Sequence, residues 1–224
     1  MFFSRVWIDP NRRGARRLLT SPQRIHAVVA GATSHAEGKQ RPLWRLDQSA
    51  SGLQLLVVSK HEPDFTSLLE QCDIPAEDGW QTTSYDPFLG ALAEEQVWRF
   101  RLAANPVRSL REVSDPTSLT RGKRVPIVGM ERLQEWLTSK ADSLGVEFPD
   151  SGVTVTQREA NAFTRKVTPN AASNAPRQRV SISRVQYDGV LTVKEPELLR
   201  TKLTAGVGSA KAYGCGLLTL APMP

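Results

Sequence analysis

The chain has 224 residues, of which 40% are hydrophobic, so it is long enough to bury a core as one large domain or two small ones. It contains no apolar run near the roughly 20 residues that cross a bilayer and no secretory signal pattern, so we expect a cytoplasmic protein with no membrane segment. Its two cysteines and three histidines do not have the spacing of metal ligands, and we expect neither a metal nor a cofactor. The formal net charge of +6 divides into +7 over residues 1–60, −8 over residues 61–100 and +7 over residues 101–224, a pattern as typical of an ordinary solvated surface as of a face that binds polyanions.

The first half of the chain has the element order of a ferredoxin-like unit. Alternating apolar and polar residues predict a first strand, and Ser21 as N-cap with Pro22 at the first helical position predicts a helix near residues 22–30. Further strands are expected over residues 42–47, 53–60 and 96–102, with a short helix over residues 65–71. This order, β-α-β-β-α-β, predicts an N-terminal ferredoxin-like domain over residues 1–106 and a linker over residues 107–122.

The second half of the chain has a similar order of elements. A short strand over residues 125–128 precedes an amphipathic helix over residues 130–144, and a hairpin turn is expected at Asp188 and Gly189. The remaining predicted elements are strands 153–163, 180–186, 190–193 and 217–220 and a helix near residues 195–203. We therefore predict an α+β protein of two tandem ferredoxin-like, RRM-like domains, the second over residues 123–224.

His26 is the first candidate for chemistry. Its imidazole can accept or donate a proton near neutral pH, and it lies one turn into a helix whose start attracts anions. Gln23 is three residues earlier and shares that helix face. Taken alone, a single histidine on an amphipathic helix is more often a surface or capping residue.

A glycine-rich segment follows the last predicted helix. It contains Gly206, Gly208, Gly214 and Gly216, together with Ser209 and Lys211, which allows backbone N–H groups to approach phosphates. The spacing matches neither a Walker A loop nor a dinucleotide fingerprint. The alternative is a tight turn with structural glycines.

Basic residues also gather in the predicted hairpin between residues 158 and 184. Such a hairpin can follow phosphates or enter a groove; equally, it can be a solvated edge hairpin protected by charge. Its candidate RNA-binding residues are Arg158, Arg165, Lys166, Arg177 and Arg179.

Several short sequence motifs follow one another along nearly the whole chain. They are residues 22–26 (PQRIH), 42–46 (PLWRL), 62–64 (EPD), 100–106 (FRLAANP), 122–125 (GKRV), 135–137 (EWL), and the glycine-rich end at residues 206–218 with residues 221–222 (AP). In this order and spacing the sequence resembles the CasE (Cse3) family of CRISPR-associated endoribonucleases, the precursor-crRNA processing subunits of type I-E Cascade.

The resemblance implies two tandem ferredoxin-like domains and binding of the repeat hairpin in precursor crRNA. It implies metal-independent cleavage at the 3′ base of the stem, leaving a 2′,3′-cyclic phosphate and a 5′-hydroxyl. The partners implied are the precursor, the processed crRNA and other Cascade subunits. The family histidine falls on His26, the RNA-binding hairpin on residues 158–184, and the glycine loop on residues 206–216.

One position departs from the family pattern. A tyrosine usually stands where this chain has Gln23, whose amide forms hydrogen bonds but does not titrate. We expect His26, Gln23 and Lys211 in the catalytic site, with Arg24 and the loop N–H groups stabilising charge. Two other hypotheses remain open: an RNA-binding subunit that does not cut, and a protein-interaction subunit with no RNA contact.

Overall fold

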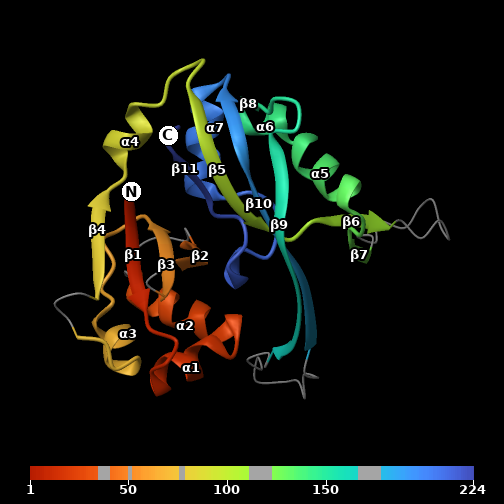
Figure 1. Ribbon diagram of the computed structural model, residues 1–224. Helices are drawn as coiled ribbons and strands as arrows, with labels where there is room; N and C mark the ends of the chain where they lie inside the picture. The colour runs from red at the N-terminus through yellow and green to blue at the C-terminus, as the bar shows by residue number, and fades with distance from the viewer. Residues whose placement is uncertain (35–40, 50–51, 76–78, 111–122, 166–177) are drawn as a thin grey trace, which may run out of the picture.

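The computed structural model describes residues 1–34, 41–49, 52–75, 79–110, 123–165 and 178–224. Its strands form two larger antiparallel sheets and one small two-stranded sheet, and helices cover one face of each larger sheet (Figure 1). The predicted α+β class is confirmed.

The first sheet has the strand order β2-β3-β1-β4. Because β3 is antiparallel to both β1 and β2, those two strands are parallel with β3 between them; β3 and β4 are likewise parallel with β1 between them. Two interleaved, split βαβ units of this kind define the ferredoxin-like topology. The elements are β1 (Phe2–Ile8), α1 (Arg13–Leu19), α2 (Pro22–Ala32), β2 (Leu43–Ser49), β3 (Gly52–Ser59), α3 (Thr66–Gln71) and β4 (Trp80–Ser84).

Alternation along the strands builds the first core. Val6 and Val57 are fully buried and face the helices, where they join the same apolar cluster as Ile25 and Val29 on the inner side of α2. The intervening residues of β1, among them Arg5, face the opposite side of the sheet, toward the second unit. The apolar face thus fixes which side of α2 is left outward for function.

The second sheet has the order β11-β5-β10-β8, and β9 also pairs with β10. Here β5 and β9 are parallel with β10 between them, and β10 and β11 are parallel with β5 between them, so this unit is also a split βαβ arrangement. The elements are β5 (Val97–Ala104), α5 (Met130–Thr138), α6 (Ala141–Leu144), β8 (Val146–Glu147), β9 (Val153–Arg165), β10 (Gln178–Val193), α7 (Pro196–Ala205) and β11 (Leu218–Ala221).

The structure corrects the assignment of the central strands. The strand expected over residues 96–102 exists as β5, but it pairs with β10 and β11 in the second sheet. The fourth strand of the first sheet is β4, which the sequence analysis missed. The chain therefore passes from one sheet to the other between β4 and β5, by way of α4 (Asp86–Gly90), and not at residue 106.

The predicted linker is also partly wrong. Residues 107–110 form β6 (Val107–Leu110), which pairs with β7 (Lys123–Pro126) in the two-stranded sheet. The expected strand at residues 125–128 is therefore not the first strand of the second unit. The rest of the predicted linker, residues 111–122, lies outside the described residues.

Two further expectations in the second half are corrected. The helix predicted over residues 130–144 is divided into α5 and α6. Asp188 and Gly189 form no turn, because β10 continues through them to Val193. A Cβ on Gly189 would lie 1.9 Å from the carbonyl oxygen of Gly152, so this glycine allows two backbones to approach closely inside the sheet.

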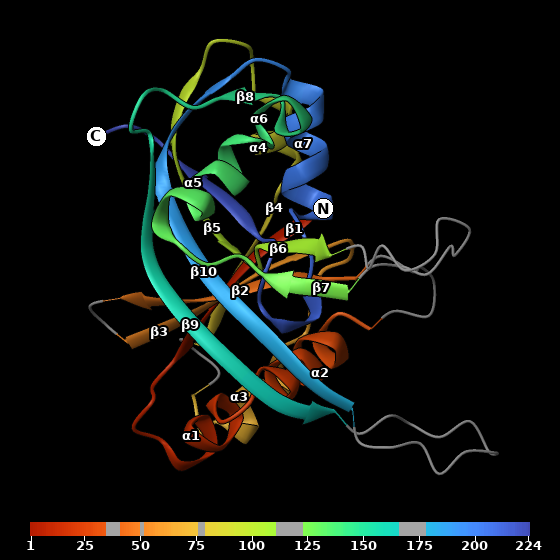
Figure 2. The same ribbon diagram turned by 90° about the vertical axis from the view of Figure 1, so that its right-hand side faces the viewer.

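Strands β9 and β10 form a long hairpin that leaves the second sheet and reaches α2 of the first unit (Figure 2). Gln186 faces Gln157 and Tyr187 faces Val155, so Thr156 is an extra residue in β9 and marks a β-bulge. The hairpin thereby connects the core of one unit to the helical side of the other.

The two units share one apolar cluster. Leu43 and Val58 of the first sheet belong to the same buried group as Leu102 and Leu218 of the second. This shared core holds the first unit against the second and fixes the position of α2 relative to the segment that precedes β11.

Candidate functional site

Local sequence fixes the start of α2. The Ser21 side chain accepts a hydrogen bond from the backbone N–H of Gln23 at 3.2 Å, and Pro22 occupies the first helical position. Ile25 and Val29 bury the inner face, which leaves Gln23 and His26 half-buried at the edge of the helix. Arg24 is exposed, and its guanidinium donates to the carbonyl of Arg17 at 3.4 Å.

The structure brings His26 beside the glycine-rich segment. The ring centroids of His26 and Tyr213 are 6.5 Å apart, with a tilt of 58° between the ring planes. Tyr213 ends a short 3-10 turn, Lys211–Tyr213, that packs against α2. Residues nearly 190 positions apart in sequence therefore meet.

The glycines shape this loop through backbone conformation and close approach. Gly214 has a φ of +76°, and a Cβ there would lie 2.7 Å from the ring of Trp44. Gly216 has a φ of +93°, and its N–H donates to the carbonyl of Ala103 at 2.6 Å. Gly206 similarly donates to the carbonyl of Lys202 at 2.8 Å, while Gly208 is exposed. Gly206 and Gly216 therefore hold the loop through bonds within the protein.

Lys211 is oriented toward the end of α7. Its ammonium donates to the carbonyl of Ala205 at 2.5 Å, a common interaction at a helix C-terminus. Burial, with repulsion from Lys202 as a smaller cause, lowers the pKa of Lys211 below its ordinary value. The structure thus gives this lysine a partner at the end of α7.

Asn105 ties three segments together, a function that the sequence analysis did not assign. Its side-chain amide donates to the hydroxyl of Ser209 in the glycine-rich loop, and that hydroxyl lies at the same distance, 3.4 Å, from the backbone carbonyl of Asn105. Its side-chain oxygen accepts from the backbone N–H of Ser183 in β10 at 3.1 Å. The residue is 8% exposed. Asn105 therefore connects the base of the long hairpin to the loop.

The predicted RNA-binding residues of the hairpin are only partly described. Arg158 is exposed on β9. Arg165 is the last residue of β9, and Arg179 pairs with Thr164 near the start of β10. Lys166 and Arg177 lie outside the described residues.

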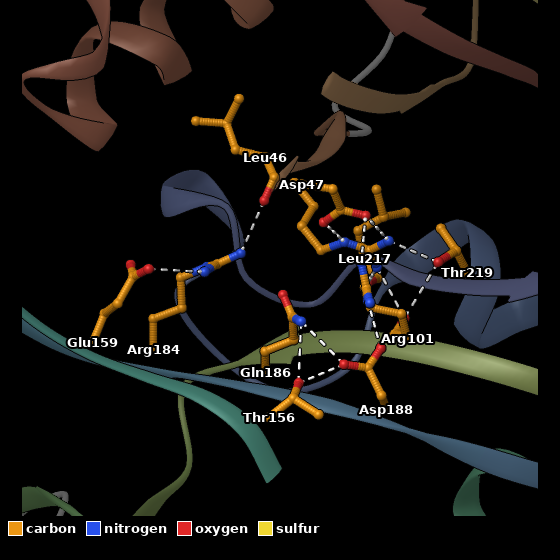
Figure 3. A network of polar contacts seen from close by, with 11 residues as sticks. Leu46, Asp47, Arg101, Thr156, Glu159, Arg184, Gln186, Asp188, Leu217 and Thr219 are labelled. Atoms are coloured by element: carbon orange, nitrogen blue, oxygen red, sulfur yellow. Dashed lines mark hydrogen bonds and ion pairs between the residues drawn. The ribbon is translucent and has the colours of Figure 1, made fainter. Parts of the chain in front are cut away.

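A buried arginine on β2 is the largest feature that the sequence analysis missed. Arg45 is 1% exposed and forms a two-pronged ion pair with Asp47, at 2.7 and 2.8 Å. The same guanidinium donates to three acceptors of the second unit, which are the carbonyls of Arg101 (2.9 Å) and Leu217 (3.0 Å) and the hydroxyl of Thr219 (2.8 Å) (Figure 3). It therefore joins the two sheets where the glycine-rich loop ends.

A second ion pair extends this network along β10. Arg101 donates to Asp188 at 2.5 Å, and Gln186 donates to the other carboxylate oxygen at 3.0 Å; Thr156 also bonds to that oxygen (Figure 3). Burial alone would raise the pKa of Asp188, but the hydrogen bonds from Arg101, Thr156 and Gln186 outweigh it, and the pKa lies below its ordinary value. The carboxylate is thus held ionised between the sheets.

Further along the hairpin, Arg184 reaches back to the first unit. Its guanidinium donates to the carbonyl of Leu46 at 3.2 Å and lies 3.6 Å from the carboxylate of Glu159 (Figure 3). Its side chain is 12% exposed. Sequence alone placed Arg184 among the basic residues of the hairpin, whereas the structure shows it fixing the hairpin against β2.

Two kinds of feature are absent from the described ranges. Within them, no three histidine, cysteine, aspartate or glutamate side chains gather as metal ligands would. No described helix has both the length and the apolar character needed to cross a bilayer.

Fold and site together define a protein of two ferredoxin-like units with a histidine set against a glycine-rich loop. The family model described as CRISPR associated protein matches residues 1–222. The chain belongs to this family of CRISPR-associated proteins.

Comparisons with individual relatives agree with this family membership. The chain is 32% identical to the CRISPR-associated endoribonuclease Cse3 of Thermus thermophilus, over 99% of this chain and 100% of that protein. The structure of Thermus thermophilus Cse3 bound to an RNA representing a pre-cleavage complex matches with a TM-score of 0.72 and 28% identity, over 99% and 98% of the two chains. The crystal structure of Cas6e from Escherichia coli K-12 matches with a TM-score of 0.59 and 20% identity over both whole chains, which shows a shared fold.

Proposed function

We propose that this protein is a metal-independent endoribonuclease that binds the repeat hairpin of precursor crRNA and cuts at the 3′ base of its stem. The observation that carries the proposal is the position of His26 on α2 beside the glycine-rich loop. The family membership of the chain, and a full-length relative named an endoribonuclease, support it. Processing would take place in the cytoplasm.

The proposed reaction uses the nucleophile of the RNA itself. The 2′-hydroxyl beside the scissile bond loses its proton and attacks the adjacent phosphorus. The bond from phosphorus to the 5′-oxygen breaks, and that oxygen gains a proton, so the products are a 2′,3′-cyclic phosphate and a 5′-hydroxyl. His26 acts as the general acid or the general base in one of these two proton transfers. General acid–base catalysis of this kind accelerates a reaction by about 10²- to 10⁴-fold.

The phosphorane gathers negative charge that the surrounding donors would stabilise. Gln23, on the same edge of α2 as His26, can donate to a phosphate oxygen, although its amide moves no proton. Lys211 and Arg24 are the nearby cations in the proposal. The Lys211 ammonium now donates to a neutral carbonyl, and a charged phosphate is a stronger acceptor that would compete for it.

The β9–β10 hairpin supplies the proposed RNA-binding surface, with Arg158, Arg165, Lys166, Arg177 and Arg179 contacting phosphates. A-form RNA has a deep, narrow major groove whose base edges side chains read poorly, so stem shape and backbone would dominate recognition. The processed crRNA would remain bound to the protein within Cascade, beside the other subunits.

The test is cleavage of an RNA hairpin with single-stranded flanks in buffer containing EDTA. Three substrates are compared: the unmodified hairpin, the same hairpin with one 2′-deoxyribose at the cut site, and an unstructured RNA of equal length. We expect only the unmodified hairpin to be cut, with a cyclic phosphate on the 5′ product. Cleavage at the deoxyribose site would exclude 2′-hydroxyl attack.

The protein variant that tests His26 is His26→Ala. We expect cleavage to fall by about 10²-fold or more, while hairpin affinity stays within a few-fold of that of the unaltered protein. Hairpin binding without cleavage by the unaltered protein would instead identify a non-catalytic RNA-binding subunit. Absence of binding by gel shift would point to the protein-interaction alternative.

A further inference from the structure

A cavity of about 320 Å³ lies where α2, β2, the glycine-rich loop and the β9–β10 hairpin meet. Pro22, one helical turn before His26, lines it from α2, and Tyr213 lines it from the loop. Because Tyr213 also lies against the His26 ring, the cavity is next to the proposed catalytic imidazole. It is nevertheless a separate space, and neither the catalytic proposal nor the phosphate-binding hairpin makes use of it.

Most of the residues that line the cavity are apolar or aromatic, although polar atoms form slightly more than half of the exposed wall. Leu46 and Leu53 line it from the first sheet, and Ile182, which is 5% exposed, lines it from β10. Trp44 contributes its indole, whose Nε1–H is buried and meets no acceptor in the described part of the chain. A buried donor without an acceptor is a rare and costly feature of folded proteins.

The charges in the wall argue against an anion as occupant. Glu159 and Arg184 are the charged residues that line the cavity, and their side chains approach to 3.6 Å. Their opposite charges compensate within the wall. The Glu159 carboxylate also accepts a hydrogen bond from Gln157 at 2.5 Å and remains partly exposed at the cavity. A phosphate would meet this carboxylate at close range, whereas a neutral group with N–H donors would satisfy it.

Size and composition then select the kind of occupant. A volume of about 320 Å³ is at the lower end of small-molecule sites, which span about 300–1,000 Å³, and it is too small for a helix or strand of a partner protein. A single heterocycle with apolar faces and a polar edge fits both the wall and the carboxylate. Unstacked RNA bases are recognised in this way, by stacking on side chains and by hydrogen bonds to their edges.

We infer that this cavity receives one nucleobase, that of the first unpaired nucleotide 3′ of the scissile bond, and that Glu159 selects bases carrying an exocyclic amino group. Adenine, cytosine and guanine each present an exocyclic amino donor to a carboxylate, whereas uracil offers only its ring N3–H, which lies between two carbonyl oxygens that a carboxylate repels. Arg184 acts as a positioning residue, because its bond to the Leu46 carbonyl and its ion pair hold Glu159 at the cavity. The inference rests on the proposed function for the identity of the RNA.

The RNA side of the test changes one nucleotide. Hairpins carrying adenine, cytosine, guanine, uracil or an abasic residue directly 3′ of the cut site are compared by their single-turnover cleavage rate and affinity. We expect the abasic substrate to lose about 10- to 100-fold in cleavage efficiency, as removal of one stacked base would. Uracil should be cut more slowly than the three amino-bearing bases. Equal cleavage of all five substrates would overturn the inference and leave the proposed function intact.

The protein side compares Glu159→Gln with Glu147→Gln. Both variants make the same chemical change, and Glu147 is an exposed residue of β8 paired with Lys194. We expect Glu159→Gln to narrow the difference between uracil and the amino-bearing bases, and Glu147→Gln to preserve it. An unchanged base preference in Glu159→Gln would remove Glu159 from the assignment.

A third measurement does not depend on cleavage. A hairpin with 2′-deoxyribose at the cut site and 2-aminopurine directly 3′ of it is titrated with the protein. We expect the emission of 2-aminopurine, which responds to stacking, to change on binding and to return toward that of the free RNA with the Ile182→Asp variant. Hairpin binding with no change in emission would refute base insertion, even for a protein that does not cut.

Discussion

The guanidinium of Arg45 donates a hydrogen bond of 3.0 Å to the backbone carbonyl of Leu217. A buried cation of the first sheet thus holds the residue that follows the last loop glycine. On the same strand, the ring of the neighbouring Trp44 packs against Gly214. Two adjacent residues of β2 therefore fix the end of the loop that faces His26.

We expect Arg45→Met to destabilise the fold by about 3–5 kcal/mol, because it removes one partner of a buried ion pair and leaves Asp47 short of donors. Arg45→Lys should lose less stability than Arg45→Met, since lysine keeps the positive charge but cannot form the two-pronged ion pair. Urea unfolding measures both. Arg99→Met, which alters an exposed arginine on β5, is the control and should stay within about 0.5 kcal/mol. Equal effects at Arg45 and Arg99 would contradict the role given to the buried guanidinium.

Gly214 and Gly208 form a matched pair for testing loop packing. Their φ angles are +76° and +77°, so alanine costs about 1–2 kcal/mol of backbone strain at either position. A Cβ at Gly208 would make an ordinary contact of 3.4 Å with Trp136, whereas one at Gly214 would lie 2.7 Å from Trp44. We therefore expect Gly214→Ala to cost about 1–3 kcal/mol more than Gly208→Ala in urea unfolding. Equal losses would mean that Trp44 moves aside freely.

Asp188 should make stability depend on acid pH. Its pKa in the folded protein is below the ordinary value of about 3.9. The ionised carboxylate therefore contributes its full share of the free energy of unfolding above that value, and this share is lost as the pH falls through the lower pKa of the folded state. Asp188→Asn removes this titration. We expect the stability gap between the two proteins to be constant from neutral pH down to about pH 5 and to shrink below about pH 4. Urea unfolding at pH 2 to 7 measures it, and a gap that stays constant down to pH 2 would contradict the depressed pKa.

Arg158 should contribute to RNA binding through charge alone. Replacing it with alanine should weaken hairpin affinity equally for different stem sequences and reduce the slope of log affinity against log salt by about one. Arg132→Ala is the control, because Arg132 is an exposed arginine on α5 and is not part of the β9–β10 hairpin. The salt slope is measured by filter binding between low and physiological salt. Identical slopes for both variants would remove Arg158 from the RNA-binding surface.

Local sequence patterns predicted most of the helices and strands but not which strands pair with one another. The helix at Pro22 follows from an N-cap and a proline, and β1 follows from alternation. The strands β2 and β3 follow from two apolar stretches on either side of a turn segment. All of these signals act over a few residues. The alternation of β5 correctly predicted a strand, yet nothing in it specifies which sheet completes its hydrogen bonds. Since β4 (Trp80–Ser84) is polar and short, the expected unit was completed with the wrong strand.

The candidate site could be predicted from the sequence to a similar extent. The proximity of His26 to the glycine-rich loop followed from the family resemblance, and the structure brings the two together. The role of Arg45 could not be predicted from the strand pattern, because three of its acceptors belong to a distant part of the chain. The same holds for Asn105 and Arg184, whose partners are set by tertiary packing and leave no signal in the neighbouring residues.

The extra residue Thr156 decides which way the outer part of the hairpin faces. Beyond the bulge, Glu159 lies opposite Arg184 on the side of the first sheet, while Arg158 lies opposite Val185 on the other side. If Thr156 instead paired with Gln186 and a regular register continued from there, Arg158 would lie opposite Arg184 and Glu159 opposite Ser183. Because a slip of one residue turns every side chain to the other face of the strand, Arg158 would then face the first sheet and Glu159 would face away from it. The bulge therefore sets an acidic partner, and not a second arginine, opposite Arg184.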